Sequence, residues 1–139
     1  MSLYMRRSSV LLFSGIAFVC LTQAADDKVE RGKYLVEEVS KCQECHTPRA
    51  ADGSFDKAKW LKGATLDIAP THEVAGWHKA SPDITGSSRL FERWQVKGVV
   101  EFLMTAKNPR GGKAERPMPD YHLSKDDAEA VVAYLKSLP

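Results

Sequence analysis

The spacing of apolar residues predicts three helices in this chain of 139 residues, over 26–40, 95–105 and 124–137. In each of them apolar side chains recur every three or four residues, which is the period of one helix face. Ser124 stands before the third helix and Asp127 follows three residues later, a spacing typical of a capped helix start. The apolar faces consist of Val29, Gly32, Leu35, Val36 and Val39 in the first helix, Val96, Val99, Val100, Leu103 and Met104 in the second, and Ala128, Val131, Val132, Leu135 and Leu138 in the third.

The two segments between these helices, 47–90 and 108–119, lack such a period. Glycine and proline interrupt both, and only 56–61 has the pattern of a single helical turn. A loop as long as the first segment is unusual in a compact domain unless it wraps another body. Three helices alone enclose little core, so we expect the loops to surround an apolar ligand.

The first 24 residues have the three parts of a secretory signal peptide. Arg6 and Arg7 give a positive start, residues 10–21 are apolar, and 22–24 form a small-residue cleavage site. The apolar part has 12 residues, whereas a membrane-spanning helix needs about 20. We therefore expect cleavage after residue 24, export to the periplasm and a single mature domain over 25–139. A retained N-terminal anchor is the alternative.

Composition and charge narrow the class of protein. Hydrophobic residues make up 43% and charged residues 27% of the chain, as in an ordinary globular domain. The formal charge of +2 comes from Arg6 and Arg7, and without them 18 basic residues face 18 acidic ones. A neutral domain does not fit a nucleic-acid-binding protein, which needs a basic surface. Cleavage also removes Cys20, which leaves Cys42 and Cys45 as the mature cysteines.

Residues 42–46 are Cys-Gln-Glu-Cys-His, which is the C-x-x-C-H motif for covalent attachment of c-type haem. On a helical turn, residues i and i+3 share a face, so the sulfurs of Cys42 and Cys45 can both bond to one porphyrin. His46 then lies beside them as the proximal iron ligand. Haem is flat, large and apolar, and it would supply the core that the loops lack. We expect one covalent haem c.

Three interpretations without haem stay open at this point. Cys42 and Cys45 could form a disulfide in an oxidising compartment. A thioredoxin-like thiol site shares the C-x-x-C spacing, but it requires a βαβ pattern that this chain lacks. A zinc site could add His72 and His78, although 26 residues separate Cys45 from His72, against about 12–15 in a zinc finger.

Several further segments resemble the class I c-type cytochromes, specifically the small bacterial single-haem kind. Residues 31–35 are similar to that family's N-terminal helix, where a glycine lets the C-terminal helix cross closely, and Tyr134-Leu135 is similar to the pair that packs at the crossing. Pro82-Asp83-Ile84-Thr85-Gly86 is similar to the family's Pro-Asn-Ile/Leu-x-Gly segment. The resemblance covers about 27–138. It implies an all-α class I cytochrome c fold, with three main helices and long loops wrapped around one covalently bound haem.

The resemblance also implies a partner for the proximal histidine. In the family, the proline carbonyl accepts the Nδ1 proton of that histidine, which corresponds here to Pro82 and His46. This hydrogen bond fixes the tautomer and makes the imidazole a better ligand. Asp83 stands where the family usually has Asn. The resemblance therefore does not say whether the side chain at this position makes the hydrogen bond that Asn would make.

Of the three tryptophans, only Trp94 matches a position of the family pattern. Trp94 is similar to a family tryptophan that often donates its indole N–H to a haem propionate, and an ordinary core position is the alternative. Trp60 and Trp77 lie in the longer stretch 47–81 and have no clear assignment in the family pattern. We expect them to pack over the haem edge or within the loop itself.

The second axial ligand decides which function follows. Pro117-Met118-Pro119 resembles the family's distal methionine loop, and the two prolines restrict the backbone around Met118. His122 is the stronger rival, and ligation by two histidines would lower the reduction potential. Met104 lies at an apolar position of a helix and fits the core instead. We therefore expect Met118 as the distal iron ligand.

Ligation by His and Met leaves no open position on the iron, so the resemblance implies one-electron transfer rather than an enzymatic reaction. We expect a periplasmic carrier that is a shuttle or the electron-accepting subunit of a dehydrogenase or oxidase. Its partners would be redox proteins, with no membrane span of its own, and docking to a membrane-bound complex stays open. A basic run over 107–116 could steer it toward an acidic partner. The alternative is a haem enzyme or gas sensor with an open distal position for peroxide, NO or CO.

Overall fold

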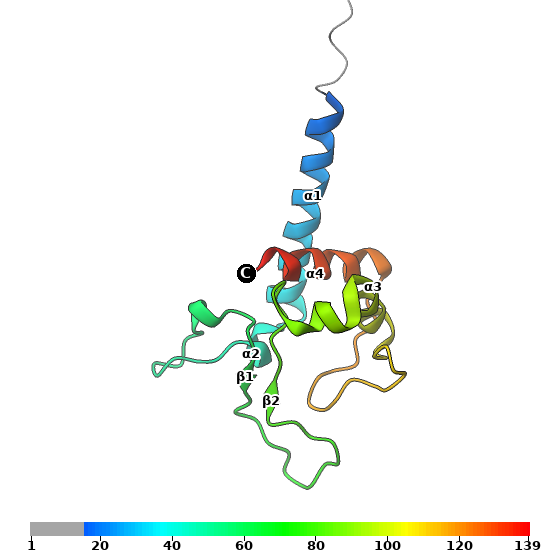
Figure 1. Cartoon of the computed structure of the whole chain (residues 1–139). Coiled ribbons are helices and arrows are strands. Elements are labelled where there is room, and N and C mark those ends of the chain that lie inside the picture. Colours follow the sequence, from blue (N-terminus) through cyan, green and yellow to red (C-terminus); the bar gives the residue numbers. More distant parts are fainter. Residues whose placement is uncertain (1–15) are drawn as a thin grey trace, which may run out of the picture.

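The fold is that of a computed structural model, which describes residues 16–139, with side chains from Ala25 onward. Three long helices dominate it: α1 (Ile16–Tyr34), α3 (Arg89–Thr105) and α4 (Lys125–Ser137). α4 packs across α1 and also contacts α3, and the long loops extend from the other side of this helical layer (Figure 1). The mostly helical architecture confirms the predicted all-α class.

The predicted signal peptide lies largely outside this description. Residues 1–15 are outside the described residues, and α1 runs as one helix from Ile16 through the expected cleavage position. Within residues 16–139, no helix is both long and apolar enough to cross a membrane. The division into a cleaved segment 1–24 and a mature domain 25–139 stays a prediction.

α1 and α4 cross in close contact at Gly32. A Cβ atom on this residue would lie 1.9 Å from the backbone oxygen of Ala130 and 2.8 Å from the Cβ atom of Tyr134. Only glycine fits, because the neighbour is another backbone and cannot move aside. This confirms the predicted close crossing and the place of Tyr134 in it. Two ion pairs border the crossing: Lys28 with Glu129 at 2.6 Å, and Arg31 with Asp127 at 2.9 Å.

The hydrophobic core lies between these helices and includes one residue from the loops. Leu61, in the long segment after C-x-x-C-H, is fully buried and packs in the same cluster as the helical residues. The predicted apolar faces of the first and third helices supply most of the rest. The other buried members of the cluster are Leu35, Val36, Val99, Leu103, Ala128, Ala130, Val131, Val132, Tyr134 and Leu135.

The first helix changes its pitch directly before C-x-x-C-H. Residues Leu35–Val39 form a π-helix, η1, in which the Ser40 N–H donates to the Leu35 carbonyl oxygen at 2.8 Å. A turn of π-helix holds more residues than an α-turn, so it rotates the following side chains out of phase. Val39 is 54% exposed, and its predicted place on the buried face is wrong for this reason.

The middle helix begins earlier than the sequence predicts. α3 starts at Arg89 and is kinked at Gln95, where φ is 55° and ψ is 173°. The predicted helix 95–105 is therefore the second half of α3, and the first half, 89–94, is too short to give a clear period. Val96 follows the kink and is 42% exposed, so its predicted burial is wrong.

Short elements order the long segment between C-x-x-C-H and α3. The motif itself forms α2 (Gln43–His46), and a 3₁₀-helix, η2 (Lys57–Lys59), lies within the predicted helical turn 56–61. β1 (Ala64–Thr65) and β2 (Ala80–Ser81) pair antiparallel, with Ala64 opposite Ser81. We call residues 66–79 between them the hairpin loop, which forms the lowest part of the molecule in Figure 1.

Substitution of Gly32 by alanine tests the helix crossing. Because the added methyl group would meet backbone atoms of Ala130, we expect Gly32→Ala to lower the free energy of unfolding by about 3 kcal/mol. Lys33→Ala, an exposed neighbour on α1, is the control and should change stability by no more than about 0.5 kcal/mol. Denaturant unfolding of the haem-loaded protein measures both, and equal stability of the two variants would contradict the close crossing.

Candidate haem site

The cysteines of C-x-x-C-H lie on one turn of α2. The chain turns sharply before it, because Lys41 has a left-handed φ of 50°, and the Cys42 N–H then donates to the Val36 carbonyl oxygen at 3.0 Å. The His46 N–H donates to the Cys42 carbonyl oxygen at 2.9 Å. Both Cys42 and Cys45 are free and half-buried. Their spacing of three residues places them on the same face of the turn.

The structure brings His46 and Pro82 together. His46 is 7% exposed, and its Nδ1 lies 2.8 Å from the Pro82 carbonyl oxygen. A carbonyl oxygen can only accept, so Nδ1 carries the proton and Nε2 keeps its lone pair. Burial lowers the pKa of His46, and the Pro82 carbonyl and Asp83 oppose this effect. A neutral imidazole with a free Nε2 is the form that binds a metal.

The β1–β2 hairpin holds the backbone of α2. The Gly63 N–H donates to the His46 carbonyl oxygen at 2.8 Å, and the Ser81 hydroxyl donates to the Cys45 carbonyl oxygen at 2.5 Å. The same Ser81 oxygen accepts the Ala64 N–H at 3.0 Å, so one side chain links both strands to the motif. The sequence analysis missed Ser81, because a single serine in a loop carries no pattern.

Asp83 fixes the backbone next to Pro82. Its Oδ1 accepts from both the N–H and the hydroxyl of Thr85, each at 2.8 Å, and Thr85 is fully buried. The Ile84 N–H donates to the Leu61 carbonyl oxygen at 3.0 Å, which ties this turn to the core. The family usually has Asn at this position. Here the Asp83 carboxylate accepts the local side-chain hydrogen bonds, so the exchange of Asn for Asp does not remove them.

Tyr121 brings the segment after Met118 next to C-x-x-C-H. Its hydroxyl donates to the Ser40 carbonyl oxygen at 3.0 Å, although 81 positions separate the two residues. Burial raises the pKa of Tyr121 to about 12, and the neighbouring Cys42 and Cys45 add to the rise. The sequence analysis missed this residue, for which the only signal was an aromatic side chain close behind Pro-Met-Pro.

The three candidates for the distal ligand differ in their surroundings. Met118 is half-buried, and its N–H donates to the Glu115 carbonyl oxygen at 3.0 Å. His122 is exposed. Met104 packs against the helical core, which confirms the core interpretation of that residue. Of the three, Met118 and His122 share the segment that Tyr121 ties to the motif.

Comparison with known proteins agrees with this geometry. The family model for cytochrome c matches residues 29–139. The chain belongs to the cytochrome c family. A protein named "Diheme cytochrome c-type" from Cereibacter sphaeroides is 34% identical over 134 residues, which are 93% of this chain and 41% of the relative. The cytochrome c subunit of a quinone alcohol dehydrogenase from Gluconobacter oxydans is 33% identical, and the cytochrome subunit of fructose dehydrogenase from Gluconobacter japonicus is 30% identical, each over 121 residues.

The cytochrome is much shorter than these relatives. The two dehydrogenase subunits match it over 83% and 82% of its length, but this covers only 25% and 23% of their own chains. What the comparisons show is the domain: a cytochrome c, the family that binds haem c covalently for electron transfer. The mostly helical fold with little sheet is that of a class I cytochrome c.

The residues present in the cytochrome fit a covalent haem. Cys42 and Cys45 are two free thiols on one face of α2, and His46 beside them presents an Nε2 with a free lone pair. In addition, the indole Nε1 of Trp77 is buried and has no hydrogen-bond partner among the described residues. These residues could bond to the porphyrin, ligate its iron and reach a polar group of the ligand.

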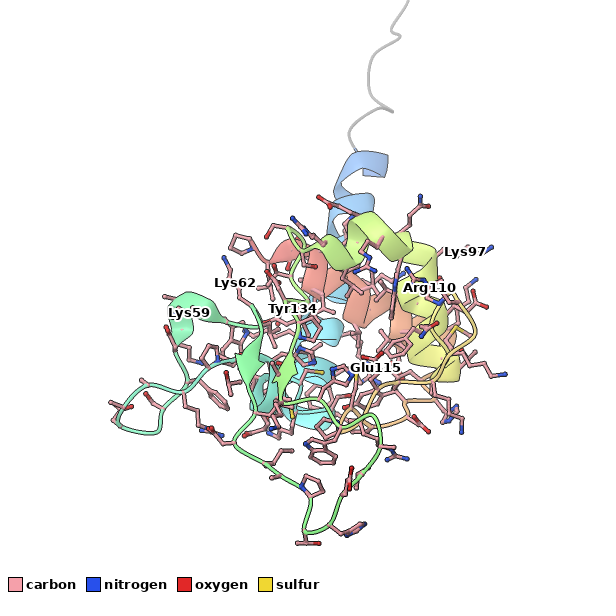
Figure 2. All side chains as sticks on the ribbon, turned by 60° about the horizontal axis from the view of Figure 1, so that its bottom comes forward. Lys59, Lys62, Lys97, Arg110, Glu115 and Tyr134 are labelled. Carbon is pink, nitrogen blue, oxygen red and sulfur yellow. The ribbon has the colours of Figure 1, made fainter. Side chains whose placement is uncertain are left out.

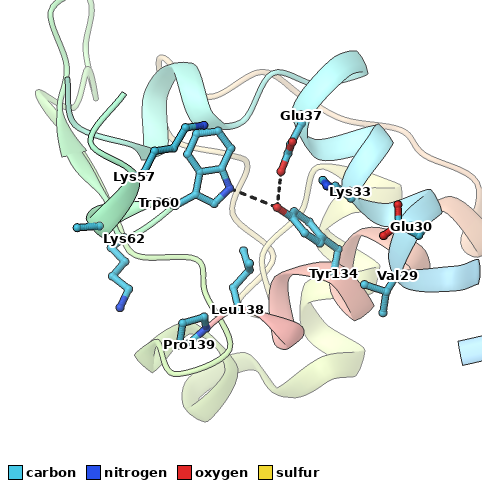
Figure 3. Close-up of a pocket in the computed structure, with 11 residues that line it drawn as sticks. Val29, Glu30, Lys33, Glu37, Lys57, Trp60, Lys62, Tyr134, Leu138 and Pro139 are labelled. Carbon is cyan, nitrogen blue, oxygen red and sulfur yellow. Dashed lines mark hydrogen bonds between the residues drawn. The ribbon is translucent and has the colours of Figure 1, made fainter. Parts of the chain in front are cut away.

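The other two tryptophans of the cytochrome pack against protein. Trp94 contacts Phe102 edge-on, with ring centroids 5.1 Å apart and an angle of 62° between the planes. The Trp60 indole donates to the Tyr134 hydroxyl at 3.3 Å, and Tyr134 in turn donates to Glu37. Figure 3 shows this chain of contacts at a surface groove of about 640 Å³. No residue of C-x-x-C-H lines that groove. Trp60 also contacts Phe55 of its own loop edge-on, with ring centroids 5.7 Å apart, so it packs within the loop, as one of the two expectations had it, and against Tyr134 of the helix crossing.

The interpretations without haem find little support in this site. The structure does not join Cys42 and Cys45. Burial raises the pKa of the Cys42 thiol to about 11, whereas a thioredoxin-like cysteine needs a lowered pKa. Among the side chains that the structure describes, residues 25–139, no three His, Cys, Asp or Glu gather as a metal site. His78, a candidate zinc ligand, instead pairs with Glu115 at 3.0 Å.

Two substitutions of Asp83 test the turn beside Pro82. Asp83→Ala leaves the N–H and hydroxyl of the buried Thr85 without this acceptor, and we expect the free energy of unfolding to fall by about 1–3 kcal/mol. Asp83→Asn keeps one acceptor oxygen and should lose clearly less. Denaturant unfolding of the haem-loaded variants measures the difference, and an equal loss in both would show that the Thr85 contacts do not matter.

Proposed function

We propose that this chain is a periplasmic mono-haem electron carrier, in which Cys42 and Cys45 hold the haem and His46 and Met118 ligate its iron. The observation that carries the proposal is the His46–Pro82 hydrogen bond next to two free cysteines on one helical turn. A disulfide or thiol site has no need of a histidine held in this tautomer, and a zinc site would need further ligands, which do not gather around it among residues 25–139. A proximal iron ligand does need this tautomer, because the bond directs Nε2 toward the metal.

The support for Met118 comes from the segment in which it lies. Tyr121 ties this segment to Ser40, two residues before C-x-x-C-H, so the backbone three residues after Met118 passes close to the motif. Met118 is half-buried, whereas His122 is exposed. A thioether is also the donor that an apolar pocket accepts at little desolvation cost, which favours Met118 over an imidazole.

The protein's own residues would act by holding both axial positions and keeping water away. Haem c, when bound, supplies a one-electron iron couple. His46 is fixed by Pro82 and cannot rotate freely, and the prolines on both sides of Met118 restrict the distal backbone. If His46 and Met118 both ligated the iron, they would leave no place for a substrate or gas, and the haem would supply one-electron transfer with little reorganisation of these side chains.

The count of one haem rests on the sequence. C-x-x-C-H occurs once, and the only other cysteine, Cys20, lies in the predicted signal peptide. The relative from Cereibacter sphaeroides is named a diheme protein, but the chain matches only 41% of it. A single-haem domain that corresponds to one part of such a longer protein explains both observations.

The partner we propose is a redox protein that delivers electrons to this domain. Two of the relatives are named as cytochrome subunits of dehydrogenases, which supports a role as the electron-accepting subunit of a dehydrogenase or oxidase. The second role that we propose is that of a free electron shuttle. Export through the predicted signal peptide would place the protein in the periplasm in either role.

A basic surface near the distal segment supports docking to an acidic partner. Lys107, Arg110, Lys113 and Arg116 are exposed, and the single acidic residue among them, Glu115, pairs with His78. Arg110 and Lys97 lie on one side of the molecule, away from Lys59 and Lys62 on the other (Figure 2). Since the mature chain is formally neutral, a local cluster of this kind is what could steer association.

Replacement of Met118 tests the distal ligand. We expect the ferric wild-type protein to show a low-spin c-type spectrum with the methionine–iron band, and Met118→Ala to lose this band because the thioether is gone. The reduced variant should then bind CO rapidly at neutral pH. His122→Ala is the control and should keep the band. If Met118→Ala kept the band, another residue would be the distal ligand. Rapid CO binding to the wild-type protein would favour a haem enzyme or gas sensor.

Oxidation by small metal complexes tests the basic surface. We expect the reduced protein to react with anionic hexacyanoferrate(III) at a rate that falls as ionic strength rises, because salt screens the attraction. The double variant Arg110→Ala/Lys113→Ala should react more slowly at low salt and depend less on salt. Lys62→Ala, on the other side, is the control. Stopped-flow absorbance measures the rates, and equal salt dependence in all three proteins would overturn the steering role.

A further inference from the structure

Three buried side-chain atoms have no hydrogen-bond partner among residues 25–139: Gln43 Oε1, Trp77 Nε1 and Ser88 Oγ. The Gln43 side chain already donates its amide hydrogen to the Glu37 carbonyl oxygen, and the Ser88 hydroxyl can rotate toward several directions. The indole N–H of Trp77 can only donate, and its direction is fixed by the ring. A buried donor without an acceptor costs about 1–3 kcal/mol, so its position requires an explanation.

Hydrogen bonds hold the backbone around Trp77. The Trp77 N–H donates to the Val74 carbonyl oxygen at 3.2 Å, in a turn where Gly76 has a φ of 74°. The next residue, His78, donates its N–H to the Arg116 carbonyl oxygen at 2.8 Å, and its Nε2 lies 3.0 Å from Glu115. The hairpin loop is therefore fastened to the segment that leads into Met118.

The other end of the same loop leads to the proximal side. β2 follows directly after the hairpin loop, Ser81 bonds to the Cys45 carbonyl oxygen, and Pro82 accepts from His46. Trp77 thus lies in a short stretch of chain that is fixed at one end to the distal segment and at the other to C-x-x-C-H. A ligand held between these two sides would have its edge near this stretch.

We propose that the Trp77 indole N–H donates a hydrogen bond to a haem propionate. The proposal rests on haem being bound at Cys42, Cys45 and His46. Apart from its iron, haem offers only two strong hydrogen-bonding groups, the propionate carboxylates, and a carboxylate accepts from an indole N–H in a charge-assisted bond. Such a bond would give the buried Trp77 donor the partner that the protein does not supply.

This assignment moves the propionate contact from Trp94 to the hairpin loop. Trp94 packs edge-on against Phe102, and its indole nitrogen is not among the buried atoms without a partner. Trp60 already donates to Tyr134. Trp77 is therefore the tryptophan of this chain whose donor is both buried and unused. Its loop lies in the long stretch 47–81, and the proposal gives that stretch a function.

Replacement of each tryptophan by phenylalanine in the haem-loaded protein tests the proposal. Phenylalanine keeps the ring and removes the N–H. Resonance Raman spectra report the propionate bending mode, which moves to lower frequency when a hydrogen bond to the carboxylate is lost. We expect this shift in Trp77→Phe and no shift in Trp94→Phe or the matched control Trp60→Phe. An unshifted Trp77→Phe spectrum would overturn the proposal, and a shift in Trp94→Phe alone would return the contact to that residue.

A second measurement uses the unmodified protein, in case Trp77→Phe does not fold. We expect the ¹⁵N-labelled ferrous protein to show one indole N–H resonance that is strongly protected from hydrogen exchange and has a nuclear Overhauser contact to the propionate side chain. The absence of any such contact from an indole would overturn the proposal. The methionine–iron band of the same sample reports the axial ligands separately, so failure of the Trp77 contact and failure of the His/Met proposal can be told apart.

Discussion

The hydrogen bond from His46 Nδ1 to the Pro82 carbonyl oxygen is the constraint on which the rest of the site depends. It fixes the tautomer of a buried imidazole and holds the ring at one orientation relative to α2. The backbone that provides this acceptor is in turn held by the Asp83–Thr85 contacts and by the hairpin through Ser81. Loss of any of these supports would let the imidazole turn, so the loop between C-x-x-C-H and α3 is as much part of the site as the motif is.

The crossing at Gly32 makes this arrangement possible from the helical side. Because α1 and α4 approach within backbone contact, Leu35 and Val36 enter the core directly before the chain turns into C-x-x-C-H. The π-helix η1 and the left-handed Lys41 then aim α2 away from the helical layer, toward the loops. The helices therefore provide a rigid base, while the loops on the other side provide the residues around the proposed haem.

Parts of this architecture follow from local sequence signals and parts do not. The capped start of α4 at Ser124, the apolar face behind it and the glycine of the crossing are local patterns, and the structure agrees with them. The first half of α3 and the outward turn of Val39 and Val96 could not be predicted, because a kink and a π-turn shift the phase without changing the composition. Tyr121 and Ser81 act on partners 81 and 36 positions away, which no spacing rule reaches.

The sequence by itself determined the motif on which the chemistry of this protein rests: residues 42–46 form the C-x-x-C-H pattern of covalent haem attachment, and its spacing is local enough to be read without a structure. The tertiary structure alone decided which residues surround that site. It brought Pro82 to His46, tied the Met118 segment to Ser40 through Tyr121, and left the Trp77 donor buried without an acceptor while Trp60 found one. Such pairings depend on where distant segments meet once the chain packs, and a loop sequence with no regular period carries no information about that.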